Sequence, residues 1–251
     1  LAGTVLIMDT VVRDDRKHLM GVTTALGSVL IIVIALFYAR PTGESIWGGM
    51  IRDDMLAFVL RLSFIFAGGI TAIFSLNYKS VAHRGDYYAI MLGAVIGMCF
   101  MASASDLILL YLAVETTGIA GYLLAGYARS NNNSAEAGLK YFLFGAATSG
   151  IMLYGFSILY GITGETNFVN IAEVLLSGDV ALSAVLGIAM LVLVGIGFKI
   201  AIVPFHFWAP DVYEGSPTPV TGFISTASKT AGFAILIRFF IVGFTGSEYW
   251  L

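Results

Sequence analysis

Four charged side chains lie inside apolar stretches of this 251-residue chain, and their types suit proton transfer. They are one glutamate and three lysines: Glu115, Lys140, Lys199 and Lys229. A glutamate or lysine held away from water can exchange a proton near neutral pH, because a low dielectric disfavours its charged form. A neighbouring opposite charge counteracts that effect, so movement of Glu115 relative to a lysine would make the lysine hold or release its proton. We therefore predict that the four residues form a proton-transfer row.

Purely structural roles for these charges also stay open. Glu115 and one lysine could form a structural ion pair that locks two helices together, although one glutamate cannot neutralise three lysines. Lys140 lies near the start of its apolar stretch and could extend its ammonium group to the membrane surface. Arg61 and Arg238 also lie in apolar stretches, but arginine stays protonated, so we expect them to anchor or pair rather than relay protons.

The region around Lys199 is the most unusual part of the sequence. A lysine at the centre of a membrane helix costs roughly 2.5–3.5 kcal/mol, and the prolines that follow interrupt helical hydrogen bonding. We predict a discontinuous helix whose first half ends near 199–203, and a second short piece that Pro204 opens at its first turn. Trp208 and Tyr213 are expected to mark the membrane interface. Four of the five prolines of the chain lie here: Pro204, Pro210, Pro217 and Pro219.

Other polar residues in or near the apolar stretches are given weaker roles. His206 could pass protons between the two halves of the discontinuous helix or hydrogen-bond to freed carbonyl groups, and both hypotheses stay open. Asp211 and Glu214 are interpreted as loop or helix-capping groups, with proton entry as the alternative. Asp106 is expected to cap a helix N-terminus.

The composition of the chain predicts a membrane protein. Hydrophobic residues make up 58% and charged residues only 12%, with a mean hydropathy of +0.89, whereas soluble domains carry about 25% charged residues. The net charge of −3 provides no basic field for nucleic acid. The single cysteine, Cys99, excludes an internal disulfide and a cysteine-ligated cluster, and we expect it to be a small apolar core residue. The three histidines lack metal-ligand spacing, so we predict no metal site.

The apolar stretches are long enough to cross a bilayer as helices, so we predict an all-α, polytopic membrane helix bundle. The expected spans are 1–12 (truncated), 19–38, 55–77, 87–104, 106–127, 138–161, 182–208 and 219–244. A very short turn at 103–106 joins two of them. In the loop 162–181, apolar spacing after Asn167 favours a short amphipathic helix capped by Asn167 or Thr166, although an ordered loop is nearly as well supported.

The distribution of basic loop residues predicts an orientation. Six basic residues occupy the first, third and fifth connections, and two, Arg40 and Arg52, occupy the opposite side, so the first set is expected in the cytoplasm. The N-terminus of the complete protein is then extracytoplasmic, as is the loop 162–181. Because the chain begins with Leu1 inside an apolar stretch, we expect a fragment of a longer protein. The six residues are Arg13, Arg16, Lys17, Lys79, Arg84 and Arg129.

The stretch VPFHFWAPDVYEGSPTPVT, residues 203–221, resembles the antiporter-like subunits of proton-pumping NADH:quinone oxidoreductase, respiratory complex I. Its long form, from Asp211 to Pro217, is similar to subunit N (subunit 2) in particular. AEAGLKYFLFGA at 135–146, DLILLYLAVE at 106–115 and the Ser228–Lys229 pair support the resemblance.

The resemblance implies specific roles. It makes Glu115, Lys140, Lys199 and Lys229 the proton-transfer set of a membrane-arm subunit that works as part of a translocase, coupled to quinone reduction elsewhere. It divides the chain into N-terminal helices at 1–86 and the first five-helix inverted repeat at 87–251, with the second repeat missing. NAD, FMN, iron–sulfur clusters and quinone are expected in other subunits and none in this chain.

The resemblance also implies surroundings: other membrane subunits of the complex, the lipid bilayer, and a bacterial plasma membrane or an equivalent energy-transducing membrane. Other functions stay open, namely a subunit of a multisubunit Na⁺/H⁺ antiporter or of a membrane-bound hydrogenase. A non-transporting assembly subunit is disfavoured, because buried lysines would serve no purpose there.

Overall fold

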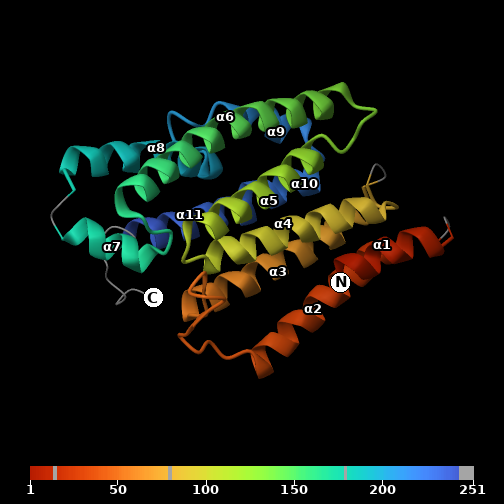
Figure 1. Ribbon diagram of the computed structural model, residues 1–251. Helices are drawn as coiled ribbons and strands as arrows, with labels where there is room; N and C mark the ends of the chain where they lie inside the picture. The colour runs from red at the N-terminus through yellow and green to blue at the C-terminus, as the bar shows by residue number, and fades with distance from the viewer. Residues whose placement is uncertain (14–15, 79–80, 178–179, 243–251) are drawn as a thin grey trace.

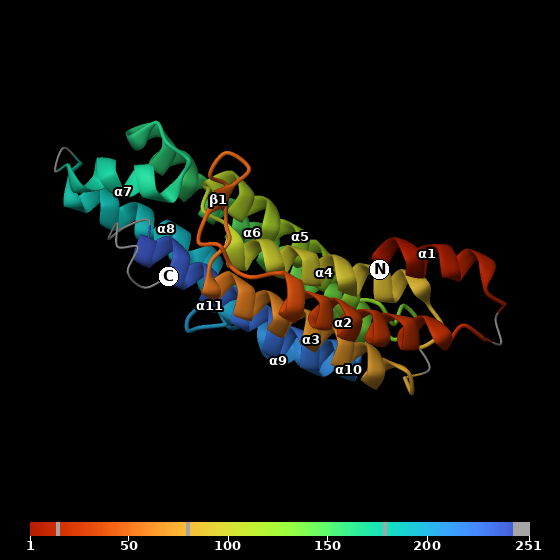
Figure 2. The ribbon, with the colours of Figure 1, turned by 90° about the horizontal axis from the view of Figure 1, so that it is seen from below.

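The computed structural model describes residues 1–13, 16–78, 81–177 and 180–242, and these form an elongated bundle of helices (Figures 1 and 2). The helices before the middle of the chain are α1 (Ala2–Val11), α2 (Leu19–Tyr38), α3 (Met55–Ser75), α4 (Gly85–Ser103) and α5 (Leu107–Ala125). Then follow α6 (Asn132–Thr163), α7 (Phe168–Leu176), α8 (Leu182–Ile200), α9 (Trp208–Gly215), α10 (Thr218–Phe223) and α11 (Lys229–Ile237). Two π-helical segments flank α11, η2 (Ile224–Ser228) and η3 (Arg238–Val242).

Seven helical segments in the described ranges are long and apolar enough to cross a membrane. They coincide with the predicted spans from 19–38 onward, while α1 covers only ten residues of the first prediction. With the family relationship given below, they make the chain an integral, multi-pass membrane protein and confirm the all-α class. The predicted end of the last span at 243–244 lies outside the described residues, as do Lys79 and Asp179 in the predicted loops.

Helix α4 lies at the centre of the bundle. It packs against α1, α3, α5 and α11, and most of its side chains are buried. Figure 1 shows α1 and α2 along one edge and α6, α8 and α9 along the opposite edge, with α4 and α5 between them. Helices α8 and α9 both contact α6, one after the other along its length.

Helix α6 begins at Asn132, earlier than the predicted start at residue 138. Asn131 caps it by accepting a hydrogen bond from the backbone N–H of Asn133, and the Ser134 hydroxyl donates to the Ala125 carbonyl at the end of α5. Polar residues at a helix start satisfy free N–H groups, so a helix can extend beyond its apolar part. The hydrophobic pattern alone could not mark this start.

Three loops are joined by backbone hydrogen bonds at one end of the bundle. A two-stranded hairpin, β1 (Ser45–Ile46) with β2 (Ile51–Arg52), leads into α3, and the sequence did not predict it. The Ser105 N–H donates to the Met50 carbonyl, and the Phe168 N–H donates to the Ser105 carbonyl. The turn at 103–106 is therefore held between the hairpin loop and the start of α7. We call these three connections, 45–54, 103–106 and 166–168, the loop-joined end.

Two predicted helix caps are confirmed at the loop-joined end. Asp106 precedes α5 and accepts hydrogen bonds from the backbone N–H groups of Ile108 and Leu109, at 2.8 and 3.2 Å. Asn167 precedes α7 and accepts one from the Val169 N–H at 3.0 Å. The segment after Asn167 is thus a helix rather than an irregular loop.

Replacing Asp106 with alanine should lower the free energy of unfolding by about 1 kcal/mol, because two N–H groups at the start of α5 lose their acceptor. Denaturant titration of the chain in detergent measures the change. Asn131→Ala is the control: it removes a cap with a single acceptor contact at an exposed position, so its effect should be smaller. Equal or reversed effects would contradict this account of the cap.

Candidate functional site

Lys199 lies in the last turn of α8 and is 3% exposed. Its aliphatic stem packs beside Gly232 of α11, where an added Cβ would overlap Ile200 and lie 3.4 Å from the Lys199 Cγ. A residue larger than glycine at position 232 would therefore push α8 and α11 apart. Among the described residues, no carboxylate lies within ion-pairing distance of Lys199.

Helix α8 ends inside the bundle directly after Lys199. Ala201 adopts a left-handed conformation with φ of 56°, and the Ile202 N–H returns to the Gly197 carbonyl at 3.0 Å. The Phe198 carbonyl accepts a hydrogen bond from the indole Nε1–H of Trp208 at 3.1 Å. Carbonyl groups at a buried helix end need donors, and here the following segment folds back to supply them.

Two predictions about this region are wrong. The second helical piece, α9, begins at Trp208 and not at Pro204, and Pro210 occupies its first turn, where a missing N–H costs nothing. Trp208 does not mark an interface: it is 2% exposed and stacks on Tyr141, with ring centroids 4.4 Å apart and planes at 10°. Tyr213 is also turned inward, and its hydroxyl is buried.

The prediction that the first helical half ends within residues 199–203 is confirmed, because α8 ends at Ile200. Helical structure then resumes in α9, and α8 and α9 lie along the same neighbour, α6. That the two cross the membrane together as one discontinuous helix stays a prediction.

His206 does not hydrogen-bond to the freed carbonyl groups, as one of the two hypotheses required. Its Nδ1 is buried and has no hydrogen-bond partner in the described chain, and its ring stacks on Phe207 at 4.9 Å. Trp208 takes over the capping of Phe198 instead. A relay role for His206 stays a hypothesis.

Glu115 lies half-buried on α5 and interacts electrostatically with Lys199. Its charge also acts on two phenol groups, those of Tyr111 on α5 and Tyr122 near the end of the same helix. Within the described ranges Glu115 forms no ion pair as close as 4 Å. The structural ion pair considered above is therefore not formed in this structure.

Aromatic and hydroxyl side chains lie between Glu115 and Lys229. The ring of Tyr122 meets that of Tyr141 edge-on, with centroids 4.8 Å apart, and the Tyr141 side chain adjoins Ser228. Lys229 follows Ser228 at the junction of η2 and α11, and its Nζ lies 5.4 Å from the centroid of the Tyr213 ring. Hydrophobic patterns do not reveal these aromatic residues as part of the site, because buried tyrosines are common in any helix bundle.

The π-helical segment η2 places Lys229. A π-helical turn contains one more residue than an α-helical turn, so it changes the direction in which the following side chain projects. Such segments are rare and are frequent near functional sites. The sequence contains no signal that predicts one here.

Lys140 occupies a different setting from the other two lysines. Its Nζ lies 2.6 Å from Glu136 Oε1 and 2.5 Å from Asp211 Oδ2, at a cavity of about 170 Å³ between α6 and α9. Glu136 could have been expected as a partner from its i,i+4 spacing, but Asp211 lies 71 residues away in the chain. The cavity wall also includes Glu214, so the acidic residues of α9 contribute to a polar opening rather than to a loop.

The two arginines predicted to pair do so. Arg61 donates to Asp53 at 2.8 Å, and Arg238 donates to Asp54 at 2.7 Å. Cys99 is partly buried and packs against the hydrophobic core, as expected. In the part of the chain that the structure describes, no group of three His, Cys, Asp or Glu residues could hold a metal ion.

The comparisons with known proteins agree with this geometry. Residues 104–250 match the family model of the NADH:quinone oxidoreductase/Mrp antiporter transmembrane region. The chain therefore belongs to this family of antiporter-like membrane subunits. Within it, the similar curated proteins are named NADH-quinone oxidoreductase subunit N, which confirms the resemblance found in the sequence.

Two of these relatives define the extent of the similarity. Subunit N of Chlorobium chlorochromatii is 40% identical over 242 residues, covering 94% of this chain and 47% of the relative. Subunit N 2 of Chloroherpeton thalassium is 44% identical over 215 residues, covering 83% and 42%. The chain thus spans about half the length of the curated relatives it matches.

Solved structures show the same fold. Respiratory complex I from Thermus thermophilus contains a chain that is 32% identical, with a TM-score of 0.77 over 94% of this chain and 51% of that one. The Mrp complex from Dietzia sp. is similar with a TM-score of 0.74, and at 21% identity it supports the fold alone.

Replacing Trp208 with phenylalanine should lower the free energy of unfolding by about 1 kcal/mol, because the Phe198 carbonyl loses the indole donor and keeps only the Ala201 N–H, while the stacking on Tyr141 is kept. Thermal unfolding in detergent measures the loss. His206→Asn is the control and should change stability less, since the His206 side chain makes no hydrogen bond in the described chain and its backbone bond to Ala209 is kept. A larger loss for His206→Asn would mean that Trp208 is not the cap.

Proposed function

We propose that this chain is the N-type antiporter-like subunit of a proton-translocating NADH:quinone oxidoreductase. In this role it moves protons through buried charged residues while electron transfer takes place in other subunits. The proposal rests on Lys199, a lysine with 3% exposure at a helix end inside the bundle and no ion-pair partner among the described residues. An unpaired buried cation is costly, so such a residue is expected to serve function rather than stability.

The proton path is proposed to use Glu115, Lys199 and Lys229 in sequence. Glu115 sets the electrostatic environment of Lys199, so a change in its charge or position would alter proton binding at that lysine. Protons then pass toward Lys229, which lies half-buried one helix away. The hydroxyl groups of Tyr141 and Ser228 lie close to this route and could carry hydrogen bonds to bound water.

Lys140 is proposed to act at the entrance. It faces a polar cavity together with Glu136 and Asp211, where it can exchange protons with water. His206 is retained as an auxiliary relay group, because its buried Nδ1 has no partner in the described chain.

The rest of the assignment follows the family. Residues 87–251 would form the first five-helix repeat, and 1–86 the preceding helices. The partners would be neighbouring membrane subunits and the lipid bilayer of a bacterial plasma membrane or an equivalent membrane, with the N-terminal side of the complete protein extracytoplasmic. NAD, FMN, iron–sulfur clusters and quinone would bind to other subunits.

A Na⁺/H⁺ antiporter subunit is the second candidate, supported by the fold shared with the Mrp complex. Sodium prefers carboxylate and carbonyl oxygen ligands, whereas the buried row here consists of one glutamate and lysines. This chemistry favours proton transfer.

Lys199→Ala and Lys199→Arg in the full-length subunit within the assembled complex separate proton transfer from a simple charge role. Both should abolish proton pumping, because alanine binds no proton and arginine does not release one. Proton uptake by reconstituted vesicles, measured with a pH-sensitive dye during NADH oxidation, reports pumping. Normal pumping by Lys199→Ala in a fully assembled complex would refute the relay.

Rescue by Lys199→Arg would instead indicate that only the positive charge matters. Lys17, which lies outside the predicted spans, provides the control: Lys17→Ala should leave pumping unchanged. Sodium-driven flux by the full-length subunit alone would favour the antiporter.

Asp211→Asn should slow proton pumping several-fold without stopping it, because Lys140 keeps Glu136 as a partner while the cavity loses one proton-exchanging group. Glu214→Gln is the matched control: it removes a carboxylate from the same cavity that has no ion pair with Lys140 in the described structure. Initial pumping rates in the same vesicles give the comparison. An equal effect of both changes would show that the Asp211–Lys140 contact has no special role at the entrance.

A further inference from the structure

The structure contains a second buried charged group that the proton path does not use. Arg238 is 1% exposed and Asp54 is 4% exposed, and the Arg238 Nη2 donates to Asp54 Oδ1 at 2.7 Å. The two residues are 184 positions apart in the chain. We propose that the Arg238–Asp54 pair positions Lys229 by fixing helix α11 against the start of α3 and the end of α4.

The pair joins two helix ends with matching charges. Asp54 is the N-cap of α3, and its Oδ1 also accepts the Ala57 N–H at 2.8 Å. The Arg238 Nε donates to the carbonyl of Ala102, in the last turn of α4. A helix N-terminus favours a negative group and a C-terminus favours a positive one, so each charge also satisfies backbone groups that the helix itself leaves free.

The location ties the pair to the loop-joined end. Asp54 follows the β1–β2 hairpin directly, and Ala102 precedes the turn at 103–106. Both segments are held by the backbone hydrogen bond from Ser105 to Met50. The Asp54 carboxylate, to which Arg238 donates its hydrogen bond, therefore belongs to the loop-joined end.

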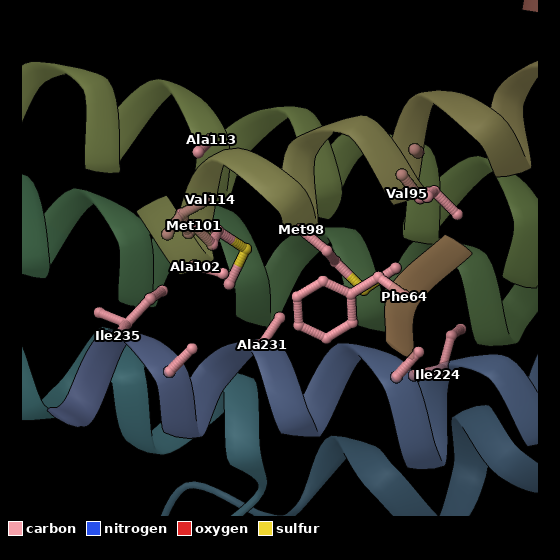
Figure 3. Close-up of a cluster of buried hydrophobic side chains, with 14 of the residues drawn as sticks. Phe64, Val95, Met98, Met101, Ala102, Ala113, Val114, Ile224, Ala231 and Ile235 are labelled. Atoms are coloured by element: carbon pink, nitrogen blue, oxygen red, sulfur yellow. The ribbon is translucent and has the colours of Figure 1, made fainter. Parts of the chain in front are cut away.

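Helix α11 approaches α8 closely at Gly232, and the bonds of Arg238 add directional contacts on its α4 side. Figure 3 shows Ala231 and Ile235 of α11 facing Met98, Met101 and Ala102 of α4. Methionine side chains adapt to small shifts, so the two methionines specify a register weakly. The π-helical segments η2 and η3 also interrupt the regular hydrogen-bond ladder on both sides of α11.

The two ends of α11 thus carry two cations with different partners. Lys229 begins the helix and contacts a ring, that of Tyr213, while Arg238 follows its last residue and makes directional bonds to Asp54 and Ala102. A planar guanidinium held by a carboxylate and a carbonyl fixes both rotation and axial position. Because α11 is a short rigid helix, fixing Arg238 also fixes the position of Lys229 relative to Lys199.

The pair touches neither Lys199 nor Lys229, so Arg238 and Asp54 are positioning residues. The inference rests on the proposed function only for its effect on pumping. The placement of α11 can be measured independently.

The test compares Arg238→Met and Asp54→Asn in the full-length subunit within the assembled complex. Methionine keeps the length and apolar stem of arginine without its bonds, and asparagine keeps the cap of α3 while it removes the charge. Electron cryomicroscopy of each variant complex should show α11 and Lys229 displaced relative to α4. Proton pumping per electron should fall about tenfold or more, because displacements near 1 Å can cost about a hundredfold in rate.

Arg61→Met is the matched control. Arg61 forms an ion pair of similar length with Asp53 near the same end of the bundle, but it is 31% exposed, and its ion pair joins no residue of α11. It should leave both α11 and pumping unchanged. Arg238→Lys, which keeps the charge, should restore part of the pumping, whereas a merely stabilising role would show the same pumping per electron in every complex that assembles.

An unmoved α11 in both Arg238→Met and Asp54→Asn would overturn the inference. A displaced α11 with unchanged pumping would leave the positioning role intact and refute the proton path through Lys229. The two proposals therefore fail in different ways.

Discussion

The buried end of α8 is the constraint on which the site depends. A helix that stops inside a membrane bundle leaves carbonyl groups that neither lipid nor bulk water can satisfy. The chain solves this locally: Ile202 returns to Gly197, and the Trp208 indole caps Phe198. That return places Trp208 on Tyr141, while Lys199 lies on α8, which packs between α6 and α11. The lysine, the helix break and the aromatic cluster are thus one arrangement.

Three kinds of buried or half-buried cation in this bundle show how surroundings decide a role. Lys140 has two carboxylate partners beside a polar cavity, Lys199 has only the more distant Glu115, and Arg238 is fully paired. Removing one partner from a buried pair costs about 3–5 kcal/mol, which suits Arg238 to a structural task. A lysine without a close partner has no such reason to stay charged, which suits Lys199 to proton exchange.

The bundle also divides into a fixed end and an open end. Backbone hydrogen bonds tie the hairpin, the turn at 103–106 and the start of α7 together, and Arg238 attaches α11 to the same frame. The cavity at Lys140 lies between α6 and α9, away from these joined loops. The helix that carries Lys229 is thus attached to the fixed end, whereas Lys140 faces the polar cavity between α6 and α9.

The sequence by itself determined the class of fold, the spans from 19–38 onward, the caps Asp106 and Asn167, and the family. Each of these depends on local composition or on a contiguous motif, and the cost of polar groups in lipid makes such patterns strict. It also singled out Glu115, Lys140, Lys199 and Lys229, because charges in apolar stretches are rare.

Only the tertiary structure decided which partners these groups have. It placed Lys140 with Asp211 rather than Glu115, buried Trp208 as a cap, started α9 at Trp208 rather than Pro204, and joined Arg238 to Asp54. A side chain's partner depends on which helices meet in space, and residues 71 or 184 positions apart leave no periodic trace in the chain. Helical periodicity reports which side of a helix is apolar, whereas packing alone decides what that side touches.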